Sequence, residues 1–129
     1  MSKHISACRH KEIAHIFEAI EYGMMQAIGE GFNLLHHSEY RYDLEKVAGV
    51  WNHGSVIRSW LMELTESLLM RDAEMADLEG AIPSSGEGKW TVEVALRLQV
   101  ALPVITQALM VRFSSSDQDK YGEKVIASL

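Results

Sequence analysis

The sequence predicts an all-α fold, a multi-helix domain, and three observations lead to this prediction. Its 129 residues suit one domain with one hydrophobic core. Apolar residues recur at steps of three and four along most of the chain, which is the period of helices with one buried side. No clear strand pattern appears. Because 47% of the residues are hydrophobic and 23% are charged, the chain has the composition of a folded globular protein.

Three helices are expected in the first half of the chain. The longest starts near Ile13 and stops at His36, after a run of apolar residues at helical spacing. Asp43 is a good N-cap for a short second helix that ends at Gly54, and Ser55 is the expected N-cap of a third helix that frays near residue 71. An exposed apolar stripe on these helices would favour a dimer.

The second half begins with weakly helical residues near Leu78 and a loop over residues 80–88, rich in glycine and serine. Thr91 is the expected N-cap of the next helix, and Pro103 suits the first turn of another that runs through residue 113. Residues 114–117 are expected to break the chain and cap a last helix.

Composition argues against several function classes. With 18 acidic and 12 basic residues the net charge is −6, which disfavours a nucleic-acid binder. No apolar run approaches the roughly 20 residues that span a bilayer, and the N-terminus lacks a signal peptide, so no membrane association and a cytoplasmic location are expected. Cys8 is interpreted as an incidental thiol. No metal site is expected, because the six histidines form no HExxH motif and the adjacent His36 and His37 point in different directions.

Residues 84–91 combine glycines, the Lys89 cation, a hydroxyl and the start of a helix, which together favour anion binding. The spacing fits neither a P-loop nor a dinucleotide-binding fingerprint. An ordinary capped loop is the alternative interpretation.

Glu21 and Tyr22 lie beside the apolar stripe of the first helix. A carboxylate held there without a partner would be a candidate proton donor, although a solvated residue or a surface ion pair is the simpler alternative. The large side chains Met24, Met25, Trp51 and Trp60 are expected in the core rather than at a cofactor.

Three segments in this order carry a resemblance to a known family: IEYGMMQA at residues 20–27, VWNHGSVIRSWL at 50–61 and GEGKWTVE at 86–93. They resemble 6-phosphogluconate dehydrogenase, and more narrowly the all-helical C-terminal domain of its short, NAD-preferring, decarboxylating type. The resemblance covers residues 13–129, which leaves residues 1–12 as an N-terminal extension.

The resemblance implies specific roles. The family oxidises and decarboxylates 6-phosphogluconate to ribulose 5-phosphate, a step of the pentose phosphate pathway, and uses a Rossmann domain for NAD or NADP and the helical domain for substrate binding and dimerisation. Glu21 matches the general acid. Tyr22, Lys89 and Thr91 match ligands of the substrate phosphate, and Arg58 falls in a segment that contacts substrate.

The departures from the family are equally specific. Ala14 stands where the family has its catalytic lysine, and Phe17 and Glu18 replace a histidine and an asparagine that hold the substrate. Because the sequence shows no nucleotide-binding pattern, the chain is expected to carry no cofactor. Because it also lacks the catalytic lysine, it is expected to be inactive alone. It would be the substrate-binding, homodimeric part of an enzyme completed by a separate cofactor-domain chain. The alternative is a non-catalytic sugar-phosphate-binding or homodimeric assembly module.

Overall fold

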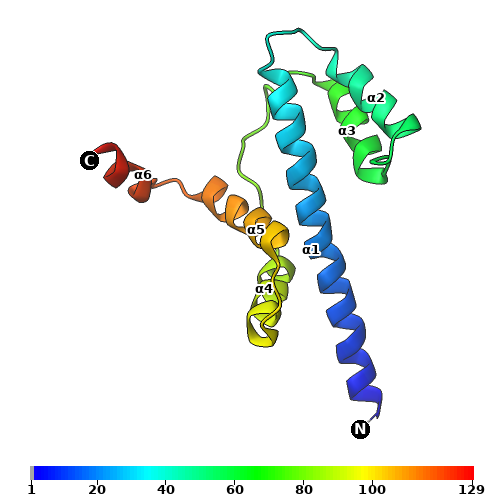
Figure 1. Cartoon of the computed structure of the whole chain (residues 1–129), viewed down its shortest axis with the longest axis vertical. Coiled ribbons are helices and arrows are strands. Elements are labelled where there is room, and N and C mark those ends of the chain that lie inside the picture. Colours follow the sequence, from blue (N-terminus) through cyan, green and yellow to red (C-terminus); the bar gives the residue numbers. More distant parts are fainter. Residues whose placement is uncertain (1) are drawn as a thin grey trace. The chain divides into compact units, whose positions relative to one another are not determined.

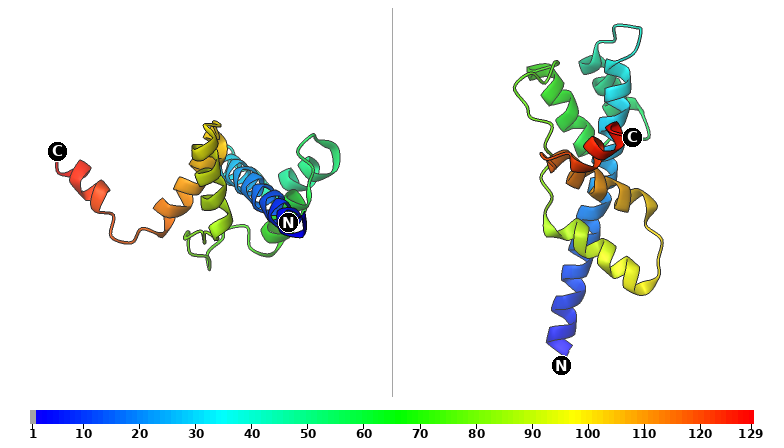
Figure 2. Two further views of the ribbon diagram at one scale, coloured as in Figure 1. Left: turned by 90° about the horizontal axis from the view of Figure 1, so that it is seen from below. Right: turned by 90° about the vertical axis from the view of Figure 1, so that its left-hand side faces the viewer.

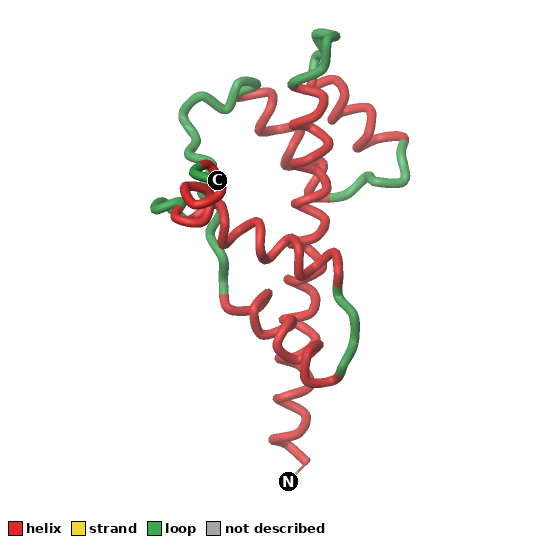
Figure 3. Tube along the Cα trace, turned by 60° about the vertical axis from the view of Figure 1, so that its left-hand side comes forward, coloured by secondary structure: helices red, strands yellow, loops and turns green. Residues whose placement is uncertain are grey.

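The computed structural model describes residues 2–129, with side chains from Arg9 onward, and every regular element in that range is a helix (Figures 1 and 3). The all-α prediction is confirmed. None of the described helices is long and apolar enough to cross a bilayer. The side chain of Cys8 lies outside the described residues. The helices are α1 (Ser2–His36), α2 (Leu44–Gly54), α3 (Trp60–Arg71), α4 (Gly86–Leu98), α5 (Pro103–Ser116) and α6 (Tyr121–Ala127).

The contacts between Cα atoms divide the chain into two units. The first unit consists of residues 1–23 and 80–129, and the second unit consists of residues 24–79. The first unit therefore holds the beginning of α1 with α4, α5 and α6, and the second unit holds the end of α1 with α2 and α3.

In the second unit, α2 and α3 lie side by side next to the last turns of α1 (Figure 1). Ala48, Met62 and Leu69 are buried between them, and partly buried apolar side chains close around this core. Among these, Phe32 of α1 packs edge to face on Trp51 of α2, with ring centroids 5.5 Å apart. Burial of these side chains is the main stabilising contribution in this unit.

The caps of α2 and α3 show one correct and one wrong prediction. Asp43 caps α2 as expected, and its carboxylate accepts a hydrogen bond from Lys46 N at 3.2 Å. Ser55 does not cap α3: its hydroxyl instead donates to the Trp51 carbonyl and closes the end of α2. Ser59 is the N-cap of α3, because its hydroxyl accepts from Met62 N at 3.1 Å.

Replacing Ser59 by alanine should lower the free energy of unfolding by about 1 kcal/mol, because Met62 N–H loses its acceptor. Ser67→Ala is the matched control, since Ser67 is exposed within the same helix and alanine favours helix. Urea denaturation of the two variants measures the difference. Equal stability would show that Ser59 is not the functional cap.

In the first unit, α4 packs against α5, and Tyr22 of α1 is buried with Ala108 and Leu109 of α5. Helix α4 starts at Gly86 after Ser85 as N-cap, so the loop is shorter than predicted and Thr91 is not its N-cap. Pro103 occupies the first turn of α5, as predicted.

Three other boundaries were wrong. Helix α1 starts at Ser2 rather than near Ile13. The segment near Leu78 is irregular rather than helical, and Met75 within it has a positive φ of 51°. Helix α5 continues through Ser116, and Asp117 follows it as the C-cap instead of capping a last helix.

The predicted buried stripe of α1 is exposed over the first unit. Ile13, Ile16 and Ile20 lie on the surface, whereas Ala19 and Tyr22 are buried. Periodicity shows that apolar faces exist, but the helices that pack on α1 decide which face is covered. Trp60 of α3 is likewise 76% exposed, so its assignment to the core was wrong. Every residue of helix α6 is exposed. In the left view of Figure 2 this helix lies beyond the end of α5.

Candidate functional site

Tyr22 joins α1 to the start of α4. Its side chain is 7% exposed, and its hydroxyl accepts a hydrogen bond from Ser85 N at 2.9 Å and shares another with Ser85 Oγ at 2.6 Å. These two residues are 63 positions apart in the sequence. The N-cap of α4 is therefore fixed directly to a side chain that the family resemblance assigns to the substrate phosphate.

Gly88 allows this close approach. A Cβ atom at Gly88 would lie 2.6 Å from Cε2 and 3.0 Å from Cδ2 of Tyr22, which is closer than non-bonded carbons pack. The glycine in the GEGKWTVE segment is thus required by the packing of α4 on Tyr22.

Arg112 is a site residue that sequence reasoning missed. It is 8% exposed, its guanidinium carbon lies 3.6 Å from the centroid of the Tyr22 ring, and Nη1 donates to the Pro83 carbonyl at 2.6 Å. The only signal in the sequence is a cation within the apolar run of α5. Arg112 thus fixes both the Tyr22 ring and the loop before α4.

Thr91 is buried, at 4% exposure, and its hydroxyl contacts two backbone carbonyls. Oγ1 lies 2.8 Å from the Glu87 oxygen, one turn earlier in α4, and 3.2 Å from the His15 oxygen in α1. In this geometry the hydroxyl connects two helices. Its predicted role as a phosphate ligand would require it to exchange one of these acceptors.

Lys89 lies on the outer side of the first turns of α4. Its side chain is 67% exposed, and its amine is 3.9 Å from the Glu93 carboxylate, a surface ion pair of small energetic weight. Ser85 makes no side-chain cap hydrogen bond to α4. An exposed cation thus accompanies helix-start amides that the cap side chain leaves available to an anion.

Glu21 and Arg58 are the two remaining predicted residues. Glu21 is half-buried in α1, and its side chain makes no hydrogen bond or ion pair with any described residue. Arg58 is exposed in the turn between α2 and α3 and belongs to the second unit. The other four predicted residues belong to the first unit: Glu21, Tyr22, Lys89 and Thr91.

The positions that depart from the family also lie in α1. Ala14 and Phe17 are exposed, and Glu18 is half-buried. No amine therefore stands at position 14, and an apolar ring and a carboxylate occupy the two replaced positions.

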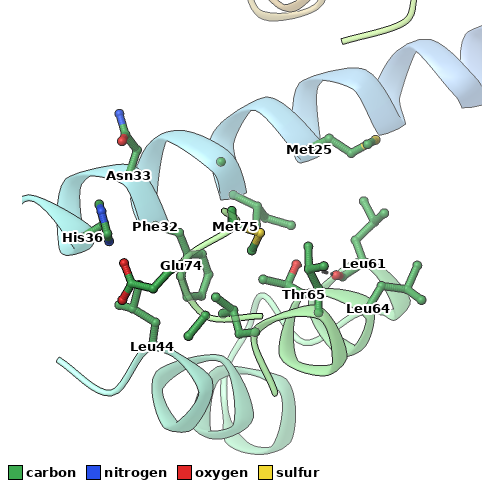
Figure 4. Close-up of a pocket in the computed structure, with 15 residues that line it drawn as sticks. Met25, Phe32, Asn33, His36, Leu44, Leu61, Leu64, Thr65, Glu74 and Met75 are labelled. Atoms are coloured by element: carbon green, nitrogen blue, oxygen red, sulfur yellow. Dashed lines mark hydrogen bonds between the residues drawn. The ribbon is translucent and has the colours of Figure 1, made fainter. Parts of the chain in front are cut away.

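Two grooves lie within the second unit. The first has a volume of about 530 Å³ and is mainly apolar, with Met25, Phe32, Leu61 and Leu64 along it and polar atoms of Glu74 at one side (Figure 4). None of the predicted site residues lines it. The second groove, of about 410 Å³, is lined in part by Arg58. Among the described side chains, no three of His, Cys, Asp and Glu gather as a metal site.

Glu87, in the first turn of α4, is the titratable group of the first unit with a clear shift. Its pKa lies below the ordinary value of 4.5, chiefly because the Ser85 hydroxyl and the backbone N–H of Glu87 stabilise the carboxylate, and also because of the nearby His15 and Glu18. An acidic residue at a helix start also interacts favourably with the helix dipole.

This shift predicts a dependence of stability on pH. Because the pKa is lower in the folded state, the carboxylate contributes stability above its ordinary pKa and loses it as the pH falls through the folded value. Thermal unfolding between pH 7 and pH 3 should therefore show a smaller acid-induced loss for Glu87→Gln than for the unchanged chain. Parallel curves for the two proteins would contradict this assignment.

Comparison with known proteins decides the family. The family model of the 6-phosphogluconate dehydrogenase C-terminal domain matches residues 12–127. The chain belongs to the 6-phosphogluconate dehydrogenase family. The all-helical structure agrees with the C-terminal helical domain of that family, as the resemblance implied.

Individual members of the family give the same assignment. The chain is 58% identical over 114 residues to the putative 6-phosphogluconate dehydrogenase YqeC of Bacillus subtilis, covering 88% of this chain and 38% of that protein. It is 40% identical over 111 residues to the NAD(+)-dependent, decarboxylating 6-phosphogluconate dehydrogenase of Haloferax volcanii, covering 85% of this chain and 37% of that protein. The chain thus spans less than two fifths of the length of these relatives.

Proposed function

We propose that this chain is the substrate-binding and dimerisation domain of a decarboxylating 6-phosphogluconate dehydrogenase, and that it binds the substrate phosphate at the first turns of α4. The observation that carries the proposal is the fixed contact of Tyr22 with Ser85, next to an uncapped helix start and the exposed Lys89. Helix-start amides and a lysine supply the donors and the positive charge that a phosphate needs.

Glu87 shares this helix start. Its carboxylate interacts with the Ser85 hydroxyl and the Glu87 backbone N–H, and its Oε2 atom is buried, so a bound phosphate would compete with the carboxylate for that N–H. In this arrangement the exposed Lys89 is the first candidate for a phosphate contact. Tyr22, Thr91 and Arg58 are second candidates, because the Tyr22 and Thr91 hydroxyls are engaged within the protein and Arg58 lies in the second unit.

Isothermal titration calorimetry with 6-phosphogluconate tests this function. We expect binding by the unchanged chain and an affinity about tenfold lower for Lys89→Gln, since a hydrogen bond to a charged group contributes roughly 1.5–3 kcal/mol. Lys124→Gln is the matched control, because Lys124 is also an exposed lysine in a surface ion pair of the first unit. Absence of binding at millimolar ligand, or equal losses in both variants, would overturn the proposal.

Catalysis is proposed to require more than this chain. In the full enzyme Glu21 would donate the proton to the enediol intermediate and a separate cofactor domain would hold NAD or NADP. Without a lysine at position 14 the chain has no base in the expected place, which favours inactivity of the isolated chain. A dehydrogenase assay with and without an added cofactor domain tests this, and turnover by the isolated chain would contradict it.

A homodimer is the proposed assembly. The exposed side chains of Ile13, Phe17 and Ile20 lie on one side of α1, and burial of this apolar face against a second copy of the chain would favour a dimer. Light scattering should give twice the chain mass of 14.5 kDa. A monomer at micromolar concentration would contradict the proposal. We further propose a cytoplasmic location, because the one cysteine of the chain cannot form an internal disulfide.

The second candidate function is a non-catalytic module that binds a sugar phosphate or mediates homodimeric assembly. The observation that favours it is the combination of Ala14 and the exposed Phe17 with an intact α4 start. It predicts the same ligand binding, but no activity after any cofactor domain is added.

A further inference from the structure

Two buried polar atoms are unpaired in the part of the first unit where α1 meets α4. They are Nδ1 of His15 and Oε2 of Glu87, and neither has a hydrogen-bond partner among the described residues. A buried polar atom without a partner loses its hydrogen bonds to water and gains none in return, so folded proteins rarely leave such atoms unpaired. An imidazole nitrogen can donate and a carboxylate oxygen can accept, so these two atoms are chemically complementary.

The backbone carbonyl groups of the two residues contact the same hydroxyl group. The Thr91 hydroxyl lies 2.8 Å from the Glu87 carbonyl oxygen and 3.2 Å from the His15 carbonyl oxygen. The His15 ring also packs edge-on against Trp90, with centroids 4.6 Å apart and an angle of 73° between the planes. Residues three and four apart share a face of a helix, so Glu87, Trp90 and Thr91 lie on the same face of α4. This is the face that contacts His15 of α1.

The electrostatics agree with this proximity. His15 and Glu18 are both near enough to Glu87 to help lower the pKa of its carboxyl group, after the larger effects of Ser85 and the Glu87 backbone. Glu18 lies one turn after His15 in α1. The titratable side chains of α1 that act on Glu87 are therefore His15 and Glu18.

In the structure the two atoms do not bond to each other. We propose that small side-chain rotations in solution let Nδ1–H of His15 donate a hydrogen bond to Oε2 of Glu87, and that this pair positions the first turn of α4 for phosphate binding. The pair would act through the orientation of the helix-start amides and Lys89, without touching the ligand. This positioning role rests on the proposed function, because it requires that the start of α4 binds phosphate. The hydrogen bond between His15 and Glu87 does not depend on that function.

Nitrogen-15 NMR of the imidazole rings tests the hydrogen bond without any ligand. The proposed bond requires a proton on Nδ1 of His15, which the nitrogen-15 chemical shifts of its ring report directly. Its Nδ1 resonance should shift on Glu87→Met, while those of His53 stay unchanged. A proton on Nε2 alone, or no shift in the variant, would overturn the pair.

A double-mutant cycle on 6-phosphogluconate affinity tests the positioning role. His15→Phe keeps a ring against Trp90 and removes the donor, so it should weaken binding about fivefold in the unchanged chain and hardly at all in the Glu87→Met background. Comparison within each background cancels the effect of the lost Glu87 charge. His15→Asn, which returns a donor near the position of Nδ1, should restore most of the affinity.

Each result of the cycle has a defined meaning. The same loss in both backgrounds, or unchanged affinity with lowered stability, would show that His15 has a merely structural role and would overturn the positioning proposal. His53→Phe is the control, because His53 is an exposed histidine in the second unit. If the unchanged chain does not bind 6-phosphogluconate, the proposed function and the positioning role fail together, while the NMR result still decides the hydrogen bond.

Discussion

Replacing Arg112 by alanine is expected to lower the free energy of unfolding by about 2–4 kcal/mol. The variant loses the hydrogen bond to the Pro83 carbonyl, the contact of the guanidinium with the Tyr22 ring, and the packing of a side chain that is almost fully buried. Because the same residue holds the loop before α4, the loss should also weaken 6-phosphogluconate binding. Chemical denaturation and calorimetry measure the two effects.

Two further variants separate the causes. Arg112→Met keeps most of the side-chain volume and removes the hydrogen bond and the charge. It should therefore be more stable than Arg112→Ala by the contribution of packing, and less stable than the unchanged chain by the contribution of the hydrogen bond and the charge. Arg97→Ala is the matched control, because Arg97 is exposed on α4 and such changes stay within about 0.5 kcal/mol. If Arg112→Ala were as mild as Arg97→Ala, Arg112 would have no part in holding Tyr22 and the loop.

The second large effect is expected for Gly88→Ala. The added Cβ would overlap the Tyr22 ring, which cannot move freely because Arg112 lies over its face and Ser85 holds its hydroxyl. Because the approach of 2.6 Å is so short, the cost of overpacking should lie in the upper part of its usual range, at about 2–3 kcal/mol, whereas the better helix propensity of alanine returns about 1 kcal/mol. The net expectation is a destabilisation of about 1–2 kcal/mol.

Gly86→Ala is a close control for this effect. A Cβ at Gly86 meets no atom within 4 Å, although the residue lies only two positions earlier in the same helix turn. This variant should match or slightly exceed the stability of the unchanged chain in thermal unfolding. Equal stability of the two alanine variants would mean that α4 does not pack on Tyr22 as described.

Local rules of the sequence predicted the elements that depend on neighbouring residues alone. The Asp43 cap and the start of α5 at Pro103 follow from side-chain and ring chemistry within a few residues. The sequence did not predict that Ser59 rather than Ser55 caps α3, because both serines are good N-cap residues. The choice was decided by the Trp51 carbonyl, which takes the Ser55 hydroxyl, and by Asn52, whose side chain accepts from Ser59 N.

The site shows the same division. The family resemblance drew attention to Tyr22 and to the α4 start, and the structure brings these two together. Arg112 could not be found from spacing, because its role depends on a contact between helices far apart in the chain. Likewise, periodicity marked Ile13 as a core residue, but no helix of the first unit covers it.

The most direct test of the central claim is a nitrogen-15 amide NMR titration that compares 6-phosphogluconate with gluconate, which lacks the phosphate. Binding of the phosphate at the start of α4 predicts large shifts of the Ser85, Gly86, Gly88 and Lys89 amides with 6-phosphogluconate and almost none with gluconate. Equal shifts with both ligands, or shifts confined to the second unit, would contradict the claim that this helix start binds the substrate phosphate.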